Sequence, residues 1–360
     1  MLRNFYTKFF PIPRFLMSPS FGLDISDESL KFVELLPTTH GIRLGRYGER
    51  KIPPGVIEAG KIKDPEQLKK LLTALRQEEG VKFVRVSLPE EQVYLFRLHL
   101  DKEGLVNVRE SIELSLEEHV PIKAEDAIFD YELLAEDEKK LEVQVAAIPK
   151  NIIENYLLVF RDSFISVQSF ELEAQAIARS VIKKSDPETY MIVDFGQTRT
   201  GIFIVTRGVV IFTSTINLGG QMLNNMIKKN FNVTLEEAEK MKRKFGLQRN
   251  VENKEIFAVL LNSASVMRDE IMKLFLYWHT HKDEEGRDHP PIKKIILTGG
   301  DSNLIGLPEY FSISTKNKVE TGNVWTNVVD EKNYTPEIPF NKSLTFAAAL
   351  GLALGDFEHD

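Results

Sequence analysis

Short apolar runs that end in an acidic residue and a turn occur twice in the chain, once in each half. The first covers residues 21–26 and is followed by a second apolar run over 30–35. The other covers residues 190–200 and is followed by the run over 201–205. Apolar runs of this length, bounded by small and polar turn residues, predict pairs of β-strands joined by tight hairpins. The recurrence predicts two halves that begin alike.

Helical periodicity and further strand-length runs complete each half. In the first half they predict a helix over residues 65–79 and a strand over 83–88. In the second half they predict a strand over 209–213 and helices over 220–231 and 235–245. Strands that alternate with helices are typical of α/β proteins, so the sequence predicts a duplicated α/β fold with a cleft between its halves.

A smaller α+β unit interrupts the first half between Pro89 and Pro149. Its pattern predicts a strand, a helix and two further strands with charged turns between them, over 92–100, 106–118, 126–134 and 141–148. Two helices, 150–162 and 170–179, then lead into the second half. We expect Glu171 to lie on the second of these connecting helices.

The order of these elements predicts the domain organisation. We expect an arm at 1–20, a first core from 21–88 and 150–188, the insert at 89–149, a helical subdomain at 221–289, and a second core from 189–220 and 290–360 whose final helix can pack back on the first core. In the arm, Pro11 and Pro13 interrupt a run of aromatic and basic side chains. The arm is either a contact for lipid headgroups or a partner, or a disordered leader.

Length and composition exclude several classes of protein. At 360 residues the chain is longer than one core usually supports, so at least two packed units are expected. With 46 Lys and Arg against 53 Asp and Glu, the net charge of −7 disfavours binding to nucleic acid. The absence of cysteine excludes disulfides and thiolate metal sites and points to a reducing compartment. No apolar run approaches the roughly 18 residues that would predict a membrane span.

Small turn residues beside strand-end acids suit a bound phosphate chain. Small residues allow backbone amides to approach phosphate oxygens, and carboxylates hold Mg²⁺, here largely through water. Asp24 and Asp194 each stand at the end of a predicted strand and next to a turn. The alternative is that both acids cap hairpins, as aspartate often does in turns.

Two further elements in the second half suit a nucleoside. A predicted strand from Ile295 runs into Gly299 and Gly300, and glycines there let the backbone pass beneath a base or sugar. A strand-to-helix turn also favours paired glycines for steric reasons alone. Glu239 and Lys242 lie three residues apart and so share a helix face. Either the two side chains contact the ribose hydroxyls and the base of a nucleotide, or they form an ion pair on a solvated helix face.

The order of these motifs resembles that of the actin, heat-shock chaperone and sugar kinase superfamily over nearly the whole chain. Within it, FGLDISDESLKFVEL at 21–35 is similar to the opening motif of the PilM family of type IV pilus assembly proteins. INLGG at 216–220 and TLEEAEKMK at 234–242 resemble that family's central motif, and residues 117–122 and 129–133 resemble its insert. An insert in the first half is shared with the cell-division protein FtsA. The resemblance implies an actin-like, ribonuclease H-like fold.

The resemblance also implies ATP with Mg²⁺ in the cleft between the halves, with Asp24 and Asp194 holding the metal mainly through water. Glu171 matches the position at which relatives carry an acid or amide that positions the attacking water. The positions that match nucleotide-binding motifs are Asp24, Ser26, Ser29, Lys31, Asp194, Gly196, Thr198, Thr200, Gly219, Gly220, Glu239, Lys242, Gly299 and Gly300.

Both hairpins depart from the superfamily pattern. Ser26 stands where relatives usually have glycine, and Asp27 and Glu28 add two carboxylates. Negative charge beside a triphosphate is unfavourable unless it faces solvent or metal. In the second hairpin, Gln197 and Arg199 replace small residues. The chain is therefore at most a slow ATPase, and a pocket that binds nucleotide without hydrolysis, or a degenerate pocket, is the alternative.

The resemblance implies a cytoplasmic ATP-binding scaffold, associated with the inner membrane through its partners. It implies capture of the N-terminal peptide of a PilN-like inner-membrane protein in a groove between the first core and the insert, with self-association as a further possibility. One alternative is an FtsA-like filament and membrane tether, but residues 347–360 are apolar and then acidic, with no basic amphipathic face. Another is a small-molecule kinase, which needs a general base aimed at a substrate hydroxyl.

Overall fold

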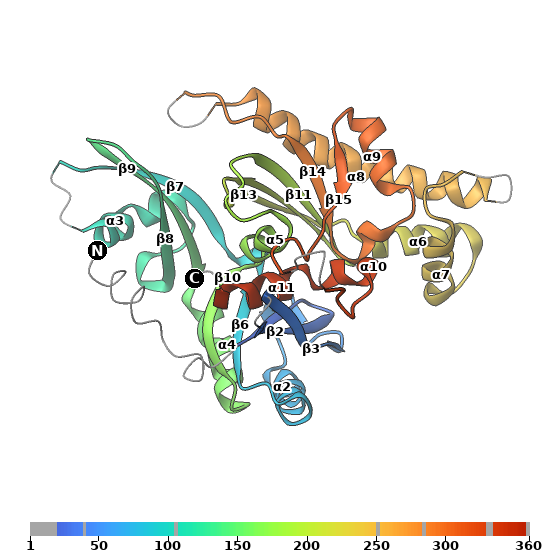
Figure 1. Ribbon diagram of the computed structural model, residues 1–360, viewed down its shortest axis with the longest axis horizontal. Coiled ribbons are helices and arrows are strands. Elements are labelled where there is room, and N and C mark those ends of the chain that lie inside the picture. The colour runs from blue at the N-terminus through green and yellow to red at the C-terminus, as the bar shows by residue number, and fades with distance from the viewer. Residues whose placement is uncertain are drawn as a thin grey trace.

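Two five-stranded sheets of equivalent topology form the two halves of the protein (Figure 1). The computed structural model describes residues 20–38, 41–103, 107–249, 253–282, 286–328 and 334–357. The predicted arm therefore falls almost wholly outside the described residues. The strand orders are β10-β6-β1-β2-β3 and β13-β12-β11-β14-β15. In each sheet three antiparallel strands lie beside two parallel ones, as the repeated sequence pattern predicts.

The first sheet is covered on both faces. Its strands are β1 (Phe21–Ile25), β2 (Ser29–Thr38), β3 (Gly41–Lys51), β6 (Phe83–Leu88) and β10 (Ser166–Leu172). Because side chains alternate along a strand, Leu23 faces a core formed with α2 (Pro65–Glu79) and α4 (Lys150–Asp162), while Gly22 faces α11 (Ala347–Leu354). The short pair β4 (Ile57–Glu58) and β5 (Lys61–Ile62) precedes α2.

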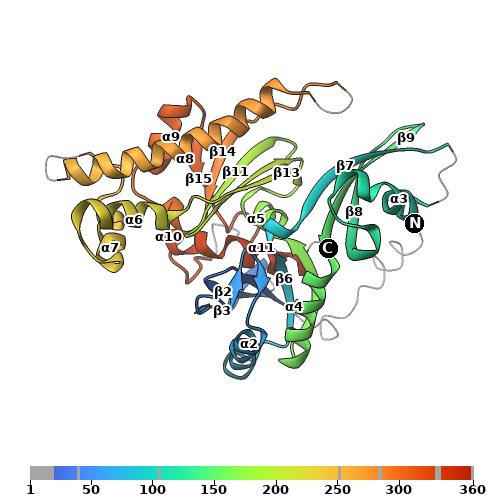
Figure 2. The same cartoon turned by 180° about the vertical axis from the view of Figure 1, so that it is seen from behind.

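Both faces of the second sheet are also covered by apolar cores. Its strands are β11 (Thr189–Phe195), β12 (Thr200–Thr206), β13 (Val209–Ile216), β14 (Lys294–Thr298) and β15 (Val319–Thr321). Met191 and Val193 face one core, which includes residues of the outer helices, and Ile192 faces the core shared with the first half. The outer helices are α6 (Gly220–Phe231), α7 (Leu235–Phe245), α8 (Lys254–Thr280) and α9 (Leu307–Thr315). Figure 2 shows α8 running along the outside of this sheet.

Helices α5 (Glu173–Val181) and α11 lie between the two sheets and join them through one apolar core. Glycine permits the close approach that this arrangement needs. A Cβ atom on Gly22 would stand 1.9 Å from the carbonyl oxygen of Ala349, and one on Gly351 would stand 1.7 Å from that of Ala176. The short α10 (Phe340–Ser343) and the 3₁₀ segments at 344–346 and 355–357 flank α11.

The insert forms a separate small unit that projects from the first half (Figure 1). Its sheet has the order β7-β9-β8, with β7 (Tyr94–Asp101), β8 (Ala127–Glu136) and β9 (Lys140–Pro149). Helix α3 (Val108–His119) packs on it, and Ile112 and Leu116 share an apolar core with Val143 and Val145. The 3₁₀ segments η2 (Glu90–Gln92) and η3 (Ala124–Asp126) complete it. Among the described residues no helix combines the length and apolar character needed to cross a bilayer.

The predicted start of the helix over 170–179 is wrong. Residues up to Leu172 form β10, which pairs in parallel with β6, and the helix begins only at Glu173. Apolar Phe170 packs on the core of the first half as an edge-strand residue, so pairing with a strand distant in sequence overrides the local helical pattern. Glu171 therefore lies on a strand and not on a connecting helix.

Candidate functional site

The first hairpin holds Asp24 in a fixed position at the end of β1. Its Oδ1 accepts a hydrogen bond from the Ser87 hydroxyl at 2.9 Å, and Lys31 Nζ lies 3.7 Å from its Oδ2. Asp24 is 5% exposed. A hydroxyl from β6 and an ammonium group from β2 thus orient a carboxylate that a lone hairpin cap would leave in solvent.

The turn that follows is closed by Ser26 itself. Its hydroxyl donates to the Ser29 carbonyl at 3.1 Å and accepts from the Ser29 amide at 3.2 Å. The predicted nucleotide contacts Ser26 and Ser29 therefore bind each other across the turn. The side chain that replaces the superfamily glycine stabilises the hairpin locally.

The second hairpin places Asp194 at the equivalent end of β11. Its Oδ1 accepts a hydrogen bond from the Thr298 hydroxyl at 2.9 Å. Burial raises the pKa of the Asp194 carboxyl; the Thr298 bond opposes that shift, and the charge of Asp24 adds to it. The two hairpin acids are therefore close enough to interact, and the ionised form of Asp194 is poorly compensated.

The turn after Asp194 packs against the beginning of α6. The Gly220 amide donates to the carbonyl of Gly196 at 3.0 Å, and the Thr200 hydroxyl donates to the carbonyl of Leu218 at 2.6 Å. A Cβ atom on Gly219 would lie 2.5 Å from the Gln197 carbonyl oxygen, so only glycine allows this approach. The structure thus brings the predicted residues of 196–200 and 219–220 together.

Glu173, at the first position of α5, belongs to the same cluster of acids. Its side chain is half-buried between the halves. Burial raises the pKa of the Glu173 carboxyl well above its usual value, Asp24, Asp194 and Glu90 raise it further, and Arg199 opposes the rise. Sequence reasoning missed Glu173 because the helix was expected to begin three residues earlier.

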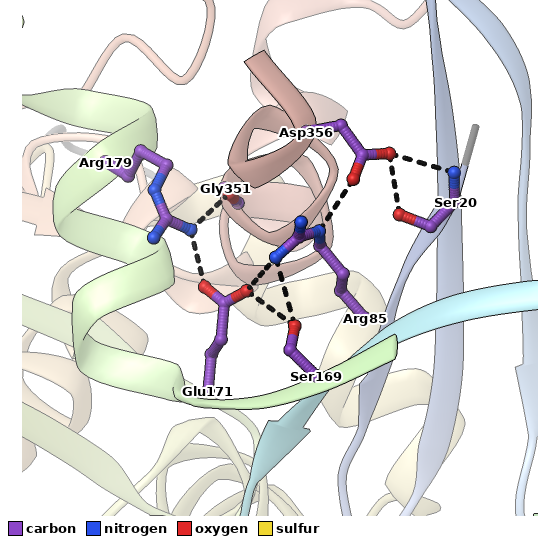
Figure 3. A network of polar contacts seen from close by, with 7 residues as sticks. All are labelled: Ser20, Arg85, Ser169, Glu171, Arg179, Gly351 and Asp356. Atoms are coloured by element: carbon purple, nitrogen blue, oxygen red, sulfur yellow. Dashed lines mark hydrogen bonds and ion pairs between the residues drawn. The ribbon is translucent and has the colours of Figure 1, made fainter. Parts of the chain in front are cut away.

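Glu171, two residues away, is held elsewhere. Its Oε1 accepts hydrogen bonds from Arg85 at 3.0 Å and Ser169 at 2.9 Å, and its Oε2 accepts one from Arg179 at 2.7 Å (Figure 3). Burial alone would raise the pKa of Glu171, but Arg179 and the other two donors lower it. Arg85 also binds Asp356 at 2.8 Å, so this network ties β6, β10 and α5 to the segment after α11. The structure does not bring Glu171 to the hairpin acids.

The predicted nucleoside residues gather around a buried ion pair. Lys242, 1% exposed, lies 2.9 Å from Glu239 Oε2 and 2.5 Å from Oδ1 of Asp301. Gly299, with φ of 86°, runs against β11, where a Cβ atom would lie 2.5 Å from the Phe195 carbonyl oxygen. Sequence reasoning missed Asp301, although it directly follows the paired glycines.

Asn224 on α6 completes this end of the site. Its Nδ2 donates to Glu239 Oε2 at 2.5 Å, while its buried Oδ1 has no hydrogen-bond partner among the described residues. A buried acceptor without a donor is costly, so this atom favours a ligand that carries a hydroxyl or amino group. The cluster can therefore accept a polar ring or sugar.

Comparison with known proteins shows to which family the chain belongs. The family model described as type IV pilus assembly protein PilM matches residues 22–357. The chain belongs to the PilM family of type IV pilus assembly proteins. The predicted family, and with it a place in type IV pilus assembly, is confirmed.

Solved structures agree on the fold of this PilM-family chain. A chain of the PilM–PilN type IV pilus biogenesis complex is 22% identical with a TM-score of 0.78, over 95% of this chain and 99% of that one. The ethanolamine utilization protein EutJ from Carboxydothermus hydrogenoformans is 15% identical with a TM-score of 0.55, over 95% of this chain and 93% of that one. MreB5 of Spiroplasma citri bound to ADP is 15% identical with a TM-score of 0.54, over 95% and 96%. The predicted actin-like fold is confirmed.

One curated relative is the cell division protein FtsA of Staphylococcus epidermidis. It is 22% identical over 211 residues, which are 52% of this chain and 43% of that protein. The match thus spans less than half the length of that relative. The family model, in contrast, covers nearly the whole of the PilM-family chain.

Proposed function

We propose that this PilM-family protein is a cytoplasmic scaffold that binds ATP with Mg²⁺ in the cleft between its halves and captures a peptide of a PilN-like inner-membrane protein. The observation that carries the nucleotide site is the pairing of Asp24 and Asp194, which stand at equivalent strand ends, where the charge of Asp24 adds to the cost of ionising the buried Asp194 carboxyl. A bound divalent cation would relieve that cost, and oxygen ligands are those that Mg²⁺ prefers. One protein of similar fold, MreB5 of Spiroplasma citri, is bound to ADP and supports the same assignment.

The residues on either side of these acids fit a nucleotide. The backbone of Gln197 lies so close to Gly219 that no side chain would fit there. Asn224, whose Oδ1 has no hydrogen-bond partner among the described residues, lies beside Glu239. We assign the phosphate chain to the turns at 26–29 and 196–200 and the nucleoside to Glu239, Lys242, Gly299 and Gly300. Bound Mg²⁺ would neutralise phosphate charge, held by Asp24 and Asp194 largely through water.

Glu173 replaces Glu171 as the acid that positions water for hydrolysis. A general base must reach the water from which it takes a proton, and Glu173 shares the charge cluster of Asp24 and Asp194 whereas Glu171 is bound by two arginines. The raised pKa of Glu173 disfavours the ionised form that a general base requires, which is consistent with slow hydrolysis. Nucleotide then acts chiefly as a ligand that brings the two halves together.

The peptide site is assigned to the boundary between the first core and the insert. A cavity of about 260 Å³ lies there, lined by Gln92 where the chain enters the insert and by Pro149 where it leaves. Residues 61–63 and the first turns of α4 form the rest of its wall. The structural match to the PilM–PilN complex supports a PilN-like partner. Through that partner the protein would associate with the inner membrane.

Calorimetric titration with a synthetic peptide tests this assignment. The peptide carries the N-terminal segment of the PilN-like protein from the same genome. We expect binding that Asn155→Arg, which places a bulky cation in the cavity, weakens by about tenfold or more. Asn230→Arg on the exposed face of α6 serves as the matched control and should bind as the native protein does. The absence of binding to the native protein would contradict the scaffold function.

A further inference from the structure

Arg199 joins the two halves at the point where the hairpins face each other. It belongs to the turn between β11 and β12, and its Nη1 lies 3.6 Å from Oδ2 of Asp27 and forms an ion pair with Oε1 of Glu91. Asp27 lies in the first hairpin, and Glu91 lies in η2 at the entrance to the insert. The Arg199 side chain is only 16% exposed, so water screens these pairs less than it screens pairs at the surface.

Asp27 carries this connection to the turn between β4 and β5. Its two carboxylate oxygens accept hydrogen bonds from the amides of Ala59 at 3.0 Å and Gly60 at 3.1 Å. Both turn residues have positive φ, 47° for Ala59 and 73° for Gly60. Since a non-glycine residue at positive φ is strained, the two bonds from Asp27 help to hold the turn in this conformation.

The same turn is bound from its other side by residues that line the cavity. Gln92 Nε2 donates to the Ala59 carbonyl at 2.9 Å, and the Tyr156 hydroxyl donates to the Gly60 carbonyl at 3.1 Å. Gln92 and Tyr156 are both part of the cavity wall. The ion pair between Arg199 and Asp27 is therefore continued by hydrogen bonds as far as the cavity beside the insert.

The charges around Arg199 favour an exchange of partners when phosphate enters the cleft. Burial lowers the pKa of Arg199, but Glu173, Glu91, Asp27 and Asp24 together raise it, so its surroundings are acidic. A guanidinium group can bind phosphate oxygens in a bidentate manner, with two hydrogen bonds in place of a single contact to a carboxylate. Arg199 lies in the same turn as Thr198 and Thr200, to which we assign phosphate contacts, so phosphate and the two acids compete for it.

We propose that Arg199 is a latch between the two halves through which occupancy of the phosphate site changes the cavity beside the insert. This proposal rests on the nucleotide and peptide sites of the proposed function. In the latched state Arg199 holds Asp27 and Glu91. When its guanidinium turns to phosphate, both acids lose their cation, the turn at Ala59 and Gly60 loses a support, and the cavity wall shifts.

Amide hydrogen exchange of the ligand-free protein tests the latch without any partner. We expect Arg199→Gln to speed exchange over residues 57–63 by about fivefold or more while exchange in α2 stays unchanged. Arg199→Lys keeps the charge and should give a smaller change, and Arg161→Gln on the exposed side of α4 should give none. Unchanged exchange over 57–63 in Arg199→Gln would overturn the proposal.

Peptide titrations with and without ATP and Mg²⁺ test the coupling. In the native protein we expect saturating nucleotide to change the peptide Kd by about fivefold or more, and in Arg199→Gln by less than about twofold. A full nucleotide effect in Arg199→Gln would refute the latch. A native protein that binds neither peptide nor nucleotide would instead refute the proposed function, and the exchange experiment would still decide whether Arg199 supports the turn.

Discussion

Glu171 and Glu173 are two residues apart in the sequence, but they belong to two clusters that differ in their ratio of carboxylates to cations. Around Glu171, the two guanidinium groups of Arg85 and Arg179 compensate two carboxylates, those of Glu171 and Asp356 (Figure 3). Around Glu173, carboxylates outnumber the cations, and the pKa of Glu173 rises where that of Glu171 falls. A compensated cluster stabilises a fold, whereas an undercompensated cluster in a cleft is typical of a site that awaits a cation. The direction of the pKa shift thus distinguishes the compensated Glu171 from Glu173, the acid that we propose to act in hydrolysis.

The largest expected effect comes from exchanging the two glutamates for glutamine. Glu173→Gln removes the proposed base and should lower the rate of ATP hydrolysis by about a hundredfold or more. Glu171→Gln should leave that rate within about threefold but lower the free energy of unfolding by about 2 kcal/mol, because Arg179 and Arg85 lose a charged acceptor.

Single-turnover hydrolysis and urea denaturation of both variants measure these effects. The comparison fails if Glu171→Gln loses hydrolysis and Glu173→Gln keeps it.

The next effect concerns Glu90, which lies behind the two hairpins in the undercompensated cluster. Burial raises its pKa from 4.5 to about 7; a long hydrogen bond from the Ala174 amide and one from Thr213 only partly oppose the shift. The folded state therefore binds a proton that the unfolded state releases, so stability falls as pH rises from about 4.5 through 7. The contribution is on the order of 3 kcal/mol.

Urea denaturation of the native protein and Glu90→Gln at several pH values measures this contribution. Between pH 4.5 and 8, the unfolding free energy of the native protein should fall by about 3 kcal/mol relative to that of Glu90→Gln. A constant difference across this range would show that folding does not raise the pKa of Glu90.

Removing one cation from each cluster gives a smaller effect that sharpens the contrast. Arg85→Met leaves Asp356 without its arginine and Glu171 with one cation fewer, and should cost about 2 kcal/mol of stability. Lys31→Met removes a contact of 3.7 Å to Asp24, which keeps its bond from Ser87, and should cost about 1 kcal/mol or less. Thermal denaturation of the two variants measures the costs, and equal losses would remove the distinction between the clusters.

The smallest effect concerns the turn that departs from the superfamily pattern. Ser26→Gly removes the hydroxyl bonds to Ser29 and should lower the free energy of unfolding by about 1 kcal/mol. Chemical denaturation of the native protein and of Ser26→Gly checks this. A stability unchanged by Ser26→Gly would mean that the hydroxyl does not close the turn.

Local pattern was sufficient to predict the repeated hairpins and the acids at their ends. The predicted run over 21–26 contains β1, and the run over 190–200 contains most of β11, which begins at Thr189. Asp24 and Asp194 stand where strand and turn meet. The paired glycines and the helix face with Glu239 and Lys242 were found for the same reason. Each of these features is encoded within a few neighbouring residues.

Long-range pairing decided what local pattern missed. Residues 166–172 alternate weakly, and only their parallel pairing with β6 makes them a strand, which moves the start of α5 to Glu173. The partners of Arg199 and Asp301 are more than 50 residues away along the chain, so sequence spacing gives no sign of them. Strand β3, with its exposed and half-buried side chains, likewise depends on β2 to form.

We propose above that Asp24 and Asp194 together hold a magnesium nucleotide. Calorimetric titration of ATP with Mg²⁺ into the native protein and Asp194→Ala tests it most directly, with Asp269→Ala on the surface of α8 as the matched control. We expect the native protein and the control to bind, and we expect the affinity of Asp194→Ala to be lower by about tenfold or more. Native affinity in Asp194→Ala, or no binding by the native protein, would contradict it.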